Sequence, residues 1–384
     1  MKKRIFCLVI CFLMVFFSGC GDDAVSSNTS AEQGSLTDGT VSSSGSVPSG
    51  SSSAVSSIAS AVSSAVHFVS SQSGSTESKP SNPSSSAASS VNSNTQAEEP
   101  QEKKPTHLIM MSDVHLEDYH KWYGLTSPDR MTKMVGDLNN FYQKDPFDHL
   151  FILGDTSLDF WENTTYGGSY RREGRSNTKT LIDDYLSRLT AKNQYIIPGN
   201  HEQYSNADWK KITGRDRQYS VVIDGWLFLM LDTFAGELDA DYDHHGIYTG
   251  VDMTFVNEQM AKYPDLPVVL CAHYFYVDKE SDLFRSLLKN KRIVCLFEGH
   301  DHVDTVEQLP KSLGLKKVFH CGNFSYTKNH NIDEFGSWGW RNVYISEDSI
   351  KIDYYTPRNI LDGGKKVIPE GIKQTAVEIE NPMK

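Results

Sequence analysis

The sequence predicts a single α/β domain in which sheets pack together and are covered by helices. Apolar runs of strand length alternate with predicted helices in the first half of the domain. Two further runs flank Asp224-Gly225, which is typical of a hairpin turn, and another pair turns at Glu347-Asp348. No second core is indicated by these patterns.

The elements are predicted from the length of each apolar run and from the Gly, Pro, Asn and Asp residues that end it. The run Tyr195-Ile-Ile-Pro-Gly199, for example, reads as a buried strand that stops at a tight loop. Strands are expected at 107–112, 148–153, 194–198, 218–224, 226–231, 267–272, 292–297, 316–321, 340–346 and 349–355. Helices are expected at 129–143, 178–191, 206–213, 252–262 and 281–290.

The first residues predict export from the cytoplasm. Lys2, Lys3 and Arg4 precede an apolar stretch at 5–17 that is short for a membrane-spanning helix. The sequence Phe17-Ser-Gly-Cys20 resembles a bacterial lipoprotein signal, although Phe17 stands where Leu is usual. We therefore expect a signal peptide at 1–19, a lipid on Cys20 and an extracytoplasmic, membrane-anchored protein. An ordinary secretory signal or a membrane anchor is the alternative.

Residues 20–105 are Ser-rich and contain few large apolar side chains. Such a segment cannot bury enough surface to offset the entropy of ordering, so a disordered tether is predicted. As a flexible coil it would reach roughly 50 Å. A globular domain is expected at 106–384.

Charge and cysteine content limit the function. The net charge of −12 argues against non-specific binding of nucleic acid, which needs a basic surface, and no specific nucleic-acid partner is predicted. Of the six cysteines, only Cys271, Cys295 and Cys321 lie in the predicted domain. An odd number predicts buried free thiols; one disulfide between strands is the alternative.

Five predicted strands end in polar residues that commonly bind metals. Carboxylate and amide oxygens can bind a metal, and an imidazole can bind a metal or pass a proton near pH 7. In chain order these residues are Asp113 and His115, Asp155, Asn200 with His201, His273, and His300 with His302.

Seven of these residues are oxygen or nitrogen ligands that would suit two metal ions. A pair of cations can make water nucleophilic at neutral pH and hold a phosphoryl group during in-line displacement. No cysteine is among the candidates, which favours Mn, Fe or Zn over a closed structural zinc site. The metal candidates are Asp113, His115, Asp155, Asn200, His273, His300 and His302.

The ordered set of motifs resembles the calcineurin-like metallophosphoesterase superfamily. The motifs are Asp113-Val-His115, Gly154-Asp155, Gly199-Asn-His-Glu202, His273 and Gly299-His-Asp-His302. The resemblance covers about residues 106–355 and implies a two-sheet β-sandwich flanked by helices.

The resemblance also implies roles for the candidate residues. One metal would be held by Asp113, His115, Asp155 and His302, and the second by Asp155, Asn200, His273 and His300. Asp155 would bridge the two ions. His201 would be the catalytic residue that contacts the phosphate, stabilising the transition state or protonating the leaving oxygen. Glu202 and Asp301 are expected to support the site or to face solvent.

One departure from a branch of the superfamily is informative. Purple acid phosphatases have Gly at the position of His115 and Tyr at that of Leu158. A tyrosinate-bound ferric centre is therefore not expected here.

Three further segments have two interpretations each. The polar segment 159–179 is either a specificity loop, whose arginines and aromatic residues grip the substrate, or a solvated loop. Asp243-His-His-Gly246 is either a plain loop, which is favoured, or a further metal or substrate contact. Trp338-Gly-Trp340 either begins a strand, which is favoured, or lines a pocket.

The predicted function is hydrolysis of a phosphomonoester or phosphodiester by metal-activated hydroxide, without a covalent enzyme intermediate. The substrate would be small and phosphorylated, with nucleotides among the candidates. The alternative from another class is a non-catalytic surface module that a metal centre merely stabilises. His201 argues against that alternative, because a structural site does not need a proton-transfer group.

Overall fold

The structure is a computed structural model. It describes residues 103–117, 121–122, 125–160, 176–237, 245–325, 337–357, 359–361, 366–368 and 370–384. All of them belong to Ser93–Lys384, one of the two compact units into which the chain divides. The predicted signal peptide and nearly all of the predicted tether lie outside these residues. Among the residues described, no helix is both long and apolar enough to cross a membrane.

The first sheet has six strands in the order β14-β11-β10-β1-β2-β3. Its strands are β1 (Thr106–Met111), β2 (His149–Leu153), β3 (Asn193–Ile197), β10 (Trp340–Ile345), β11 (Ser349–Thr356) and β14 (Gly371–Glu380). β1, β2 and β3 run parallel, while β10, β11 and β14 extend the sheet with antiparallel pairs. The carboxyl ends of β1, β2 and β3 therefore lie along the same edge.

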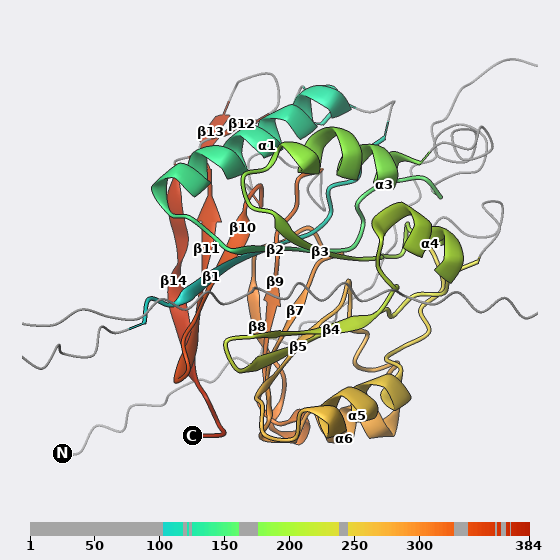
Figure 1. Cartoon of the computed structure of the whole chain (residues 1–384), viewed down its shortest axis with the longest axis vertical. Helices are drawn as coiled ribbons and strands as arrows, with labels where there is room; N and C mark the ends of the chain where they lie inside the picture. The colour runs from blue at the N-terminus through green and yellow to red at the C-terminus, as the bar shows by residue number, and fades with distance from the viewer. Residues whose placement is uncertain are drawn as a thin grey trace, which may run out of the picture. The chain divides into compact units, whose positions relative to one another are not determined.

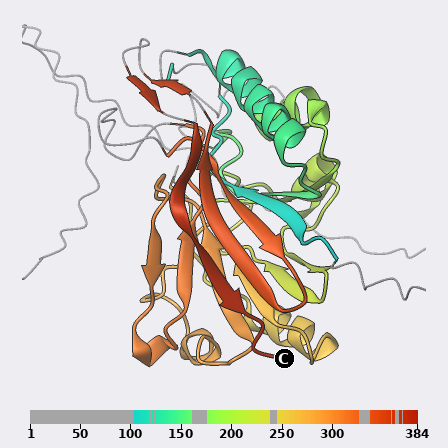
Figure 2. The ribbon, with the colours of Figure 1, turned by 90° about the vertical axis from the view of Figure 1, so that its left-hand side faces the viewer.

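The second sheet has the order β4-β5-β6-β7-β9-β8. Its strands are β4 (Tyr219–Ile223), β5 (Trp226–Met230), β6 (Val268–Cys271), β7 (Ile293–Glu298), β8 (Val306–Gln308) and β9 (Lys317–His320). The four central strands are parallel, and β4 and β8 pair antiparallel at the two edges. β12 (Asn359–Leu361) and β13 (Lys366–Ile368) form a separate hairpin, visible beyond the main sheets in Figure 2.

Helices cover the outer face of each sheet, so the architecture is a two-sheet sandwich flanked by helices, as predicted. The helices are α1 (Ser127–Lys144), α3 (Asn177–Thr180), α4 (Asn206–Thr213), α5 (Met253–Lys262) and α6 (Asp282–Leu287). Figure 1 shows α1, α3 and α4 on one side of the strands and α5 and α6 on the opposite side. Apolar side chains from both sheets fill the space between them; Phe151 and Phe228, for instance, have ring centroids 5.5 Å apart.

The sequence correctly predicted most elements but missed four strands. β8, β12 and β13 have three residues each, which is too short for a periodic pattern. β14 is longer and contains the alternation Val377-Glu-Ile379-Glu, which was a usable indication of a strand. It lies at the outer edge of the first sheet (Figures 1 and 2).

Two predicted helices end early. The helix expected at 178–191 consists of α3, a π-helical turn and a 3-10 turn that ends at Arg188, because Leu189 is extended and its side chain enters the core. The helix expected at 281–290 ends at Leu287. By contrast, α1 begins two residues before the prediction, since Thr126 caps it by accepting a hydrogen bond from the backbone N–H of Asp129.

Two favoured predictions about individual residues are confirmed. Cys271, Cys295 and Cys321 are buried, free thiols. Trp340 begins β10, and both it and Trp338 are fully buried in the core rather than lining a pocket.

Candidate metal centre

The five loops with candidate ligands follow the carboxyl ends of five parallel strands. Asp113 and His115 follow β1, Asp155 follows β2, and Asn200 follows β3. In the second sheet His273 follows β6, and His300 and His302 follow β7. Polar groups at the carboxyl ends of neighbouring parallel strands meet at one edge of the sheet, and here the edges of two packed sheets contribute to the same cluster.

Five of the seven candidate ligands have a left-handed backbone. The φ angles are 54° at Asp113, 48° at His115, 49° at Asp155, 67° at His300 and 53° at His302. This conformation is uncommon for residues other than Gly, and such strain gathers at functional sites. Backbone hydrogen bonds hold it in place: the N–H of Asp113 donates to Gly154 O at 3.2 Å, and that of His115 to Asp155 O at 2.9 Å.

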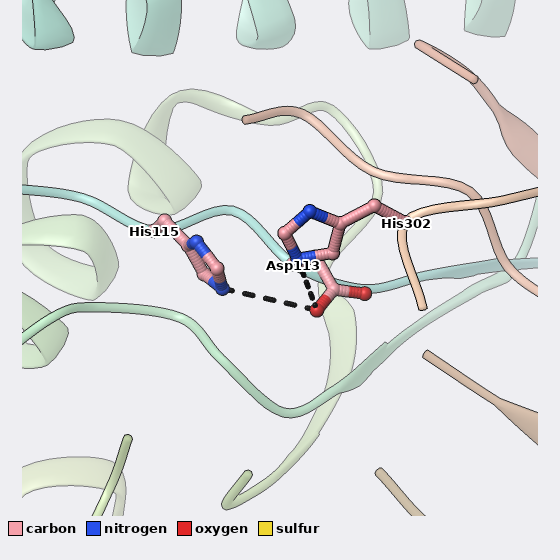
Figure 3. A group of neighbouring side chains, drawn as sticks. All are labelled: Asp113, His115 and His302. Carbon is pink, nitrogen blue, oxygen red and sulfur yellow. Dashed lines mark ion pairs between the residues drawn. The ribbon is translucent and has the colours of Figure 1, made fainter. Parts of the chain in front are cut away.

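The first group of donors comprises Asp113, His115, Asp155 and His302. Asp113 Oδ1 lies 3.3 Å from His302 Nε2 and 3.8 Å from His115 Nε2, as the dashed lines in Figure 3 show. Its other oxygen, Oδ2, accepts hydrogen bonds from the Ser112 hydroxyl (2.6 Å) and the His300 N–H (3.0 Å). These two bonds turn Oδ1 toward the histidines.

The second group comprises Asp155, Asn200, His273 and His300. Asn200 Oδ1 lies 2.9 Å from both His273 Nε2 and His300 Nδ1, and these two nitrogens are 3.2 Å apart. His273 Nδ1 lies 2.8 Å from the Leu153 carbonyl, to which it donates, so Nε2 is the ring nitrogen that faces the site and would bind a cation after losing its proton. An oxygen and two ring nitrogens directed at a common point suit a cation.

Asp155 joins the two groups. Its Oδ2 lies 3.0 Å from His115 Nε2 in the first group and 3.1 Å from His273 Nε2 in the second. Burial alone would raise the pKa of Asp155, but the histidine charges, His273 first, hold it well below its ordinary value. The carboxylate is therefore ionised and available to both groups.

The raised pKa of His273 shows that the site favours a positive charge. Burial, the largest single effect, would lower its pKa, but the charges of Asp155 and Asp113 and the hydrogen bonds to Asp155 and Leu153 together raise the pKa to about 10. A proton on this ring therefore supplies a positive charge beside two buried carboxylates. A bound cation would supply the same charge, so the residues present fit metal ions.

His201 lies beside Asp155 rather than within either group. Its Nε2 is 3.8 Å from Asp155 Oδ2, and its backbone N–H donates to Asp155 Oδ1 at 3.2 Å. The side chain is almost fully buried, and burial lowers its pKa to about 3. The ring is thus neutral near pH 7 and can donate one hydrogen bond to a group that enters the site.

Glu202 supports the loops that carry Asp155 and Asn200. Its Oε2 accepts from the backbone N–H groups of Gly199 (2.7 Å) and Asp155 (2.9 Å), and Oε1 from Ser157 N (2.9 Å) and the Thr156 hydroxyl (3.0 Å). The side chain is fully buried. This agrees with the expectation that Glu202 supports the site; Asp301 instead accepts from the Tyr274 hydroxyl at 3.2 Å.

Some contacts were not foreseen from the sequence. The Tyr276 hydroxyl lies 3.2 Å from His300 Nε2, which fixes the ring with Nδ1 toward the site. Asp159 accepts from Asn177 N at 2.8 Å and from the Tyr204 hydroxyl, which joins described residues that precede and follow 161–175 in the chain. No short motif marks either contact; only the fold brings these residues together.

The remaining predictions lie partly outside the described residues. Segment 161–175, which contains the arginines and aromatic residues of the predicted specificity loop, is not described. Asp243 and His244 are also outside, and His245 is exposed. Within the described residues, the groups able to hold a metal are Asp113–His115–His302, His115–Asp155–His201 and Asp155–His273–His300. The structure thus brings all seven metal candidates and His201 together; their roles stay predictions.

A two-sheet sandwich with carboxylate, imidazole and amide donors gathered at its strand ends is the arrangement of a metal-binding protein. Residues 106–304 match the family of calcineurin-like phosphoesterases, and the chain belongs to this family. The reaction class of this family is the hydrolysis of phosphoester bonds.

The chain is also similar to several solved structures. A dimetal phosphatase from Danio rerio has 12% identity and a TM-score of 0.47, with 73% of this chain and 100% of that chain covered. The anchor in the inner membrane complex of Plasmodium has 12% identity and a TM-score of 0.43, covering 71% and 90%. A purple acid phosphatase from yellow lupin seeds has 14% identity and a TM-score of 0.39, covering 65% and 51%. No curated protein matches the chain.

Proposed function

We propose that this protein uses two metal ions to hydrolyse a small phosphomonoester or phosphodiester. The observation that carries the proposal is the place of Asp155 Oδ2, which lies 3.0 and 3.1 Å from one histidine nitrogen of each donor group. A shared carboxylate between two sets of oxygen and nitrogen donors suits a dinuclear site.

The ligands proposed for the two ions follow the two groups. Asp113, His115, Asp155 and His302 would hold one ion, and Asp155, Asn200, His273 and His300 the other. When bound, such ions supply Lewis acidity and make water nucleophilic at neutral pH. The donor set contains no thiol, which favours Mn, Fe or Zn.

The protein's own contribution beyond the ligands comes from His201. Because its pKa is lowered to about 3, the ring is neutral and donates a hydrogen bond rather than a full proton. It lies next to the shared carboxylate, where a phosphoryl oxygen would approach. This favours stabilisation of the charge on the transferring phosphoryl group over protonation of the leaving oxygen.

The proposal is tested with p-nitrophenyl mono- and diesters. The full-length protein is stripped of metal, reloaded with Mn, Zn or Fe, and compared with His201→Ala and Asp155→Ala. His149→Ala is the control, because His149 begins β2 at the end opposite Asp155. Metal-dependent turnover that is lost in both site variants and kept in the control would support the enzyme. The better substrate would separate monoesterase from diesterase.

The alternative is a surface binding module stabilised by metal. Two bound ions without turnover on these esters or on nucleotides would favour it. Failure to bind any metal would refute both.

We further propose that the protein is exported and held at the membrane by a lipid on Cys20. The support is the sequence Phe17-Ser-Gly-Cys20 after a basic and apolar leader. Cys20→Ser should move the protein from the membrane fraction to the soluble or secreted fraction. If its distribution is unchanged, the lipid anchor is refuted.

A further inference from the structure

Three buried arginines donate hydrogen bonds to the backbone of loops that carry candidate metal ligands, here called the ligand loops. Arg130, Arg217 and Arg341 are 0%, 4% and 1% exposed. Each directs most of its N–H groups at backbone carbonyl oxygens rather than at carboxylates. A buried guanidinium needs several acceptors to offset its loss of hydration, and its planar set of five donors can fasten more than one loop at once.

Arg130, on α1, fastens the loop that follows β1. Nη2 donates to His115 O at 2.8 Å, and Nη1 donates to Val114 O and, at 2.6 Å, to Phe324 O. Its guanidinium also lies over the Trp122 ring, 4.7 Å from the centroid. Two of the three carbonyls it binds, those of Val114 and His115, belong to the stretch in which Asp113 and His115 have left-handed backbones.

Arg217 fastens the loop that follows β3. Nη1 donates to Glu202 O at 2.9 Å and to Tyr204 O at 2.8 Å, and Nη2 donates to Phe234 O at 3.3 Å. Asp232 is its carboxylate partner, with Nη2 3.2 Å from Oδ1. This loop carries Asn200 and His201. Phe234, whose carbonyl Arg217 also binds, has its ring centroid 5.8 Å from that of His273.

Arg341, on β10, fastens the loop that follows β7. Nε donates to His320 O at 2.9 Å, and Nη2 donates to Thr305 O at 2.8 Å and also to Asp304 O. Asp304 and Thr305 lie two and three residues after His302, whose backbone is left-handed. Each of these three loops with candidate ligands is thus hydrogen-bonded through its backbone to one buried arginine.

We propose that Arg130, Arg217 and Arg341 are positioning residues, which hold the ligand loops in the geometry that binds the two metals. The inference rests on the proposed function. The left-handed ligands in the loops after β1 and β7 persist only if the surrounding structure fixes them, and hydrogen bonds to nearby carbonyls do this directly. In the loop after β3, which has no left-handed ligand, Arg217 ties the backbone to Asp232 and Phe234. Positive charge alone would repel a metal ion, so the expected benefit to metal affinity comes from geometry.

Arg→Lys substitutions separate the effect of positive charge from that of loop geometry, since they keep the charge and lose the planar set of donors. Arg292→Lys is the control; Arg292 is partly buried but likewise binds three backbone carbonyls. Arg292 donates to the carbonyls of Leu266 (2.9 Å), Met260 (3.2 Å) and Tyr263, in a segment without candidate ligands. All four variants should lose thermal stability through the same kind of lost contact.

Affinity for Mn²⁺ and Zn²⁺ is measured on each full-length variant by competition with a chromophoric chelator. The visible absorption of the Co²⁺-loaded proteins reports the coordination geometry. Arg130→Lys, Arg217→Lys and Arg341→Lys are each expected to weaken binding of at least one ion about 10- to 100-fold, with an altered Co²⁺ spectrum. Arg292→Lys should bind as the wild type does.

Wild-type affinity and spectra in the three variants would overturn the inference, as would an equal loss in Arg292→Lys. If a Lys variant does not fold, Ser127→Ala and Asp232→Asn replace it, because they loosen Arg130 and Arg217 without removing them. A loss of several-fold is then expected, and unchanged affinity would again overturn the inference. A wild-type protein that binds no metal would instead refute the proposed function, and this inference with it.

Discussion

At the scale of single residues, the site depends on close approach between two loops. Gly199 packs against Asp155 so tightly that a Cβ at this position would lie 2.2 Å from Asp155 Oδ1 and 2.6 Å from its backbone nitrogen. The residue that joins both donor groups therefore requires a glycine opposite it. The sequence predicted a tight loop at Pro198-Gly199 but not which atom the glycine accommodates, because that partner is distant in the chain.

Gly199→Ala is expected to displace Asp155 and to lower the affinity for metal at least 10-fold, with a loss of about 1–3 kcal/mol in the free energy of unfolding. Gly136→Ala is the control: it lies within α1, and a Cβ there meets no atom within 4 Å. That change should stabilise the protein by about 0.5–1 kcal/mol. Urea unfolding and metal titration check both values, and equal effects of the two substitutions would contradict the argument.

The backbone conformation of the ligands is the part of the site that residue types did not reveal. Asp113, His115, Asp155, His300 and His302 are left-handed, yet Asp and His usually occupy ordinary regions. The identity of the ligands was predictable because polar residues ended apolar strands in the family order. Their strain was not, since it arises from hydrogen bonds between loops, such as Phe324 N to Asp113 O at 3.1 Å.

At the scale of elements, the buried strands were predictable, and the strands that were missed lie at the edge of a sheet or in the separate hairpin. β5 and β7 are wholly buried and appear in the sequence as apolar runs. β14 pairs only with β11 and is half exposed, so its pattern alternates and is interrupted by polar residues. Even so, Val377 and Ile379 pack against the core between the sheets.

We therefore expect Ile379→Ala to destabilise the domain by about 1–2 kcal/mol, less than for a fully buried isoleucine. Glu380→Ala, on the adjacent exposed residue, should change stability by less than about 0.5 kcal/mol. Chemical denaturation measures both. A negligible effect of Ile379→Ala would mean that β14 adds nothing to the stability of the sandwich.

At the scale of the whole molecule, one buried histidine outside the site links several elements and makes stability depend on pH. His107 in β1 is 1% exposed, lies 3.3 Å from the Pro146 carbonyl and stacks on Tyr344 of β10 with a centroid distance of 4.3 Å. Burial lowers its pKa, and Asp145 opposes this only in part. The folded protein thus binds a proton here less readily than the unfolded chain.

Protonation of His107 at low pH is therefore expected to lower the free energy of unfolding. The contribution of neutral His107 to stability is complete above the unfolded pKa of about 6.5 and is lost as pH falls from there through the lowered folded pKa. The free energy of unfolding of the wild type should therefore fall more steeply between about pH 7 and pH 5 than that of His107→Phe. Urea unfolding at several pH values measures this, and parallel curves would show that His107 does not titrate in this range.

Metal binding should also be visible in the stability of the whole molecule. Two carboxylates, Asp113 and Asp155, are buried with histidines around them, and a proton on His273 supplies compensating charge in the absence of metal. Cations that bind only the folded state add about 2.7 kcal/mol at a free concentration of 100 times Kd. For a domain of this size, that corresponds to a rise of about 5–10 °C in Tm.

The measurement compares thermal unfolding of the metal-stripped and reloaded protein. Asp155→Asn is the matched variant: it removes the carboxylate that both donor groups share and should abolish most of the rise in Tm. A similar rise in the variant would place the stabilising metal elsewhere. The same Tm for the stripped and reloaded wild type would show that these donors do not bind metal in the folded protein, because any ligand specific to the folded state must stabilise it.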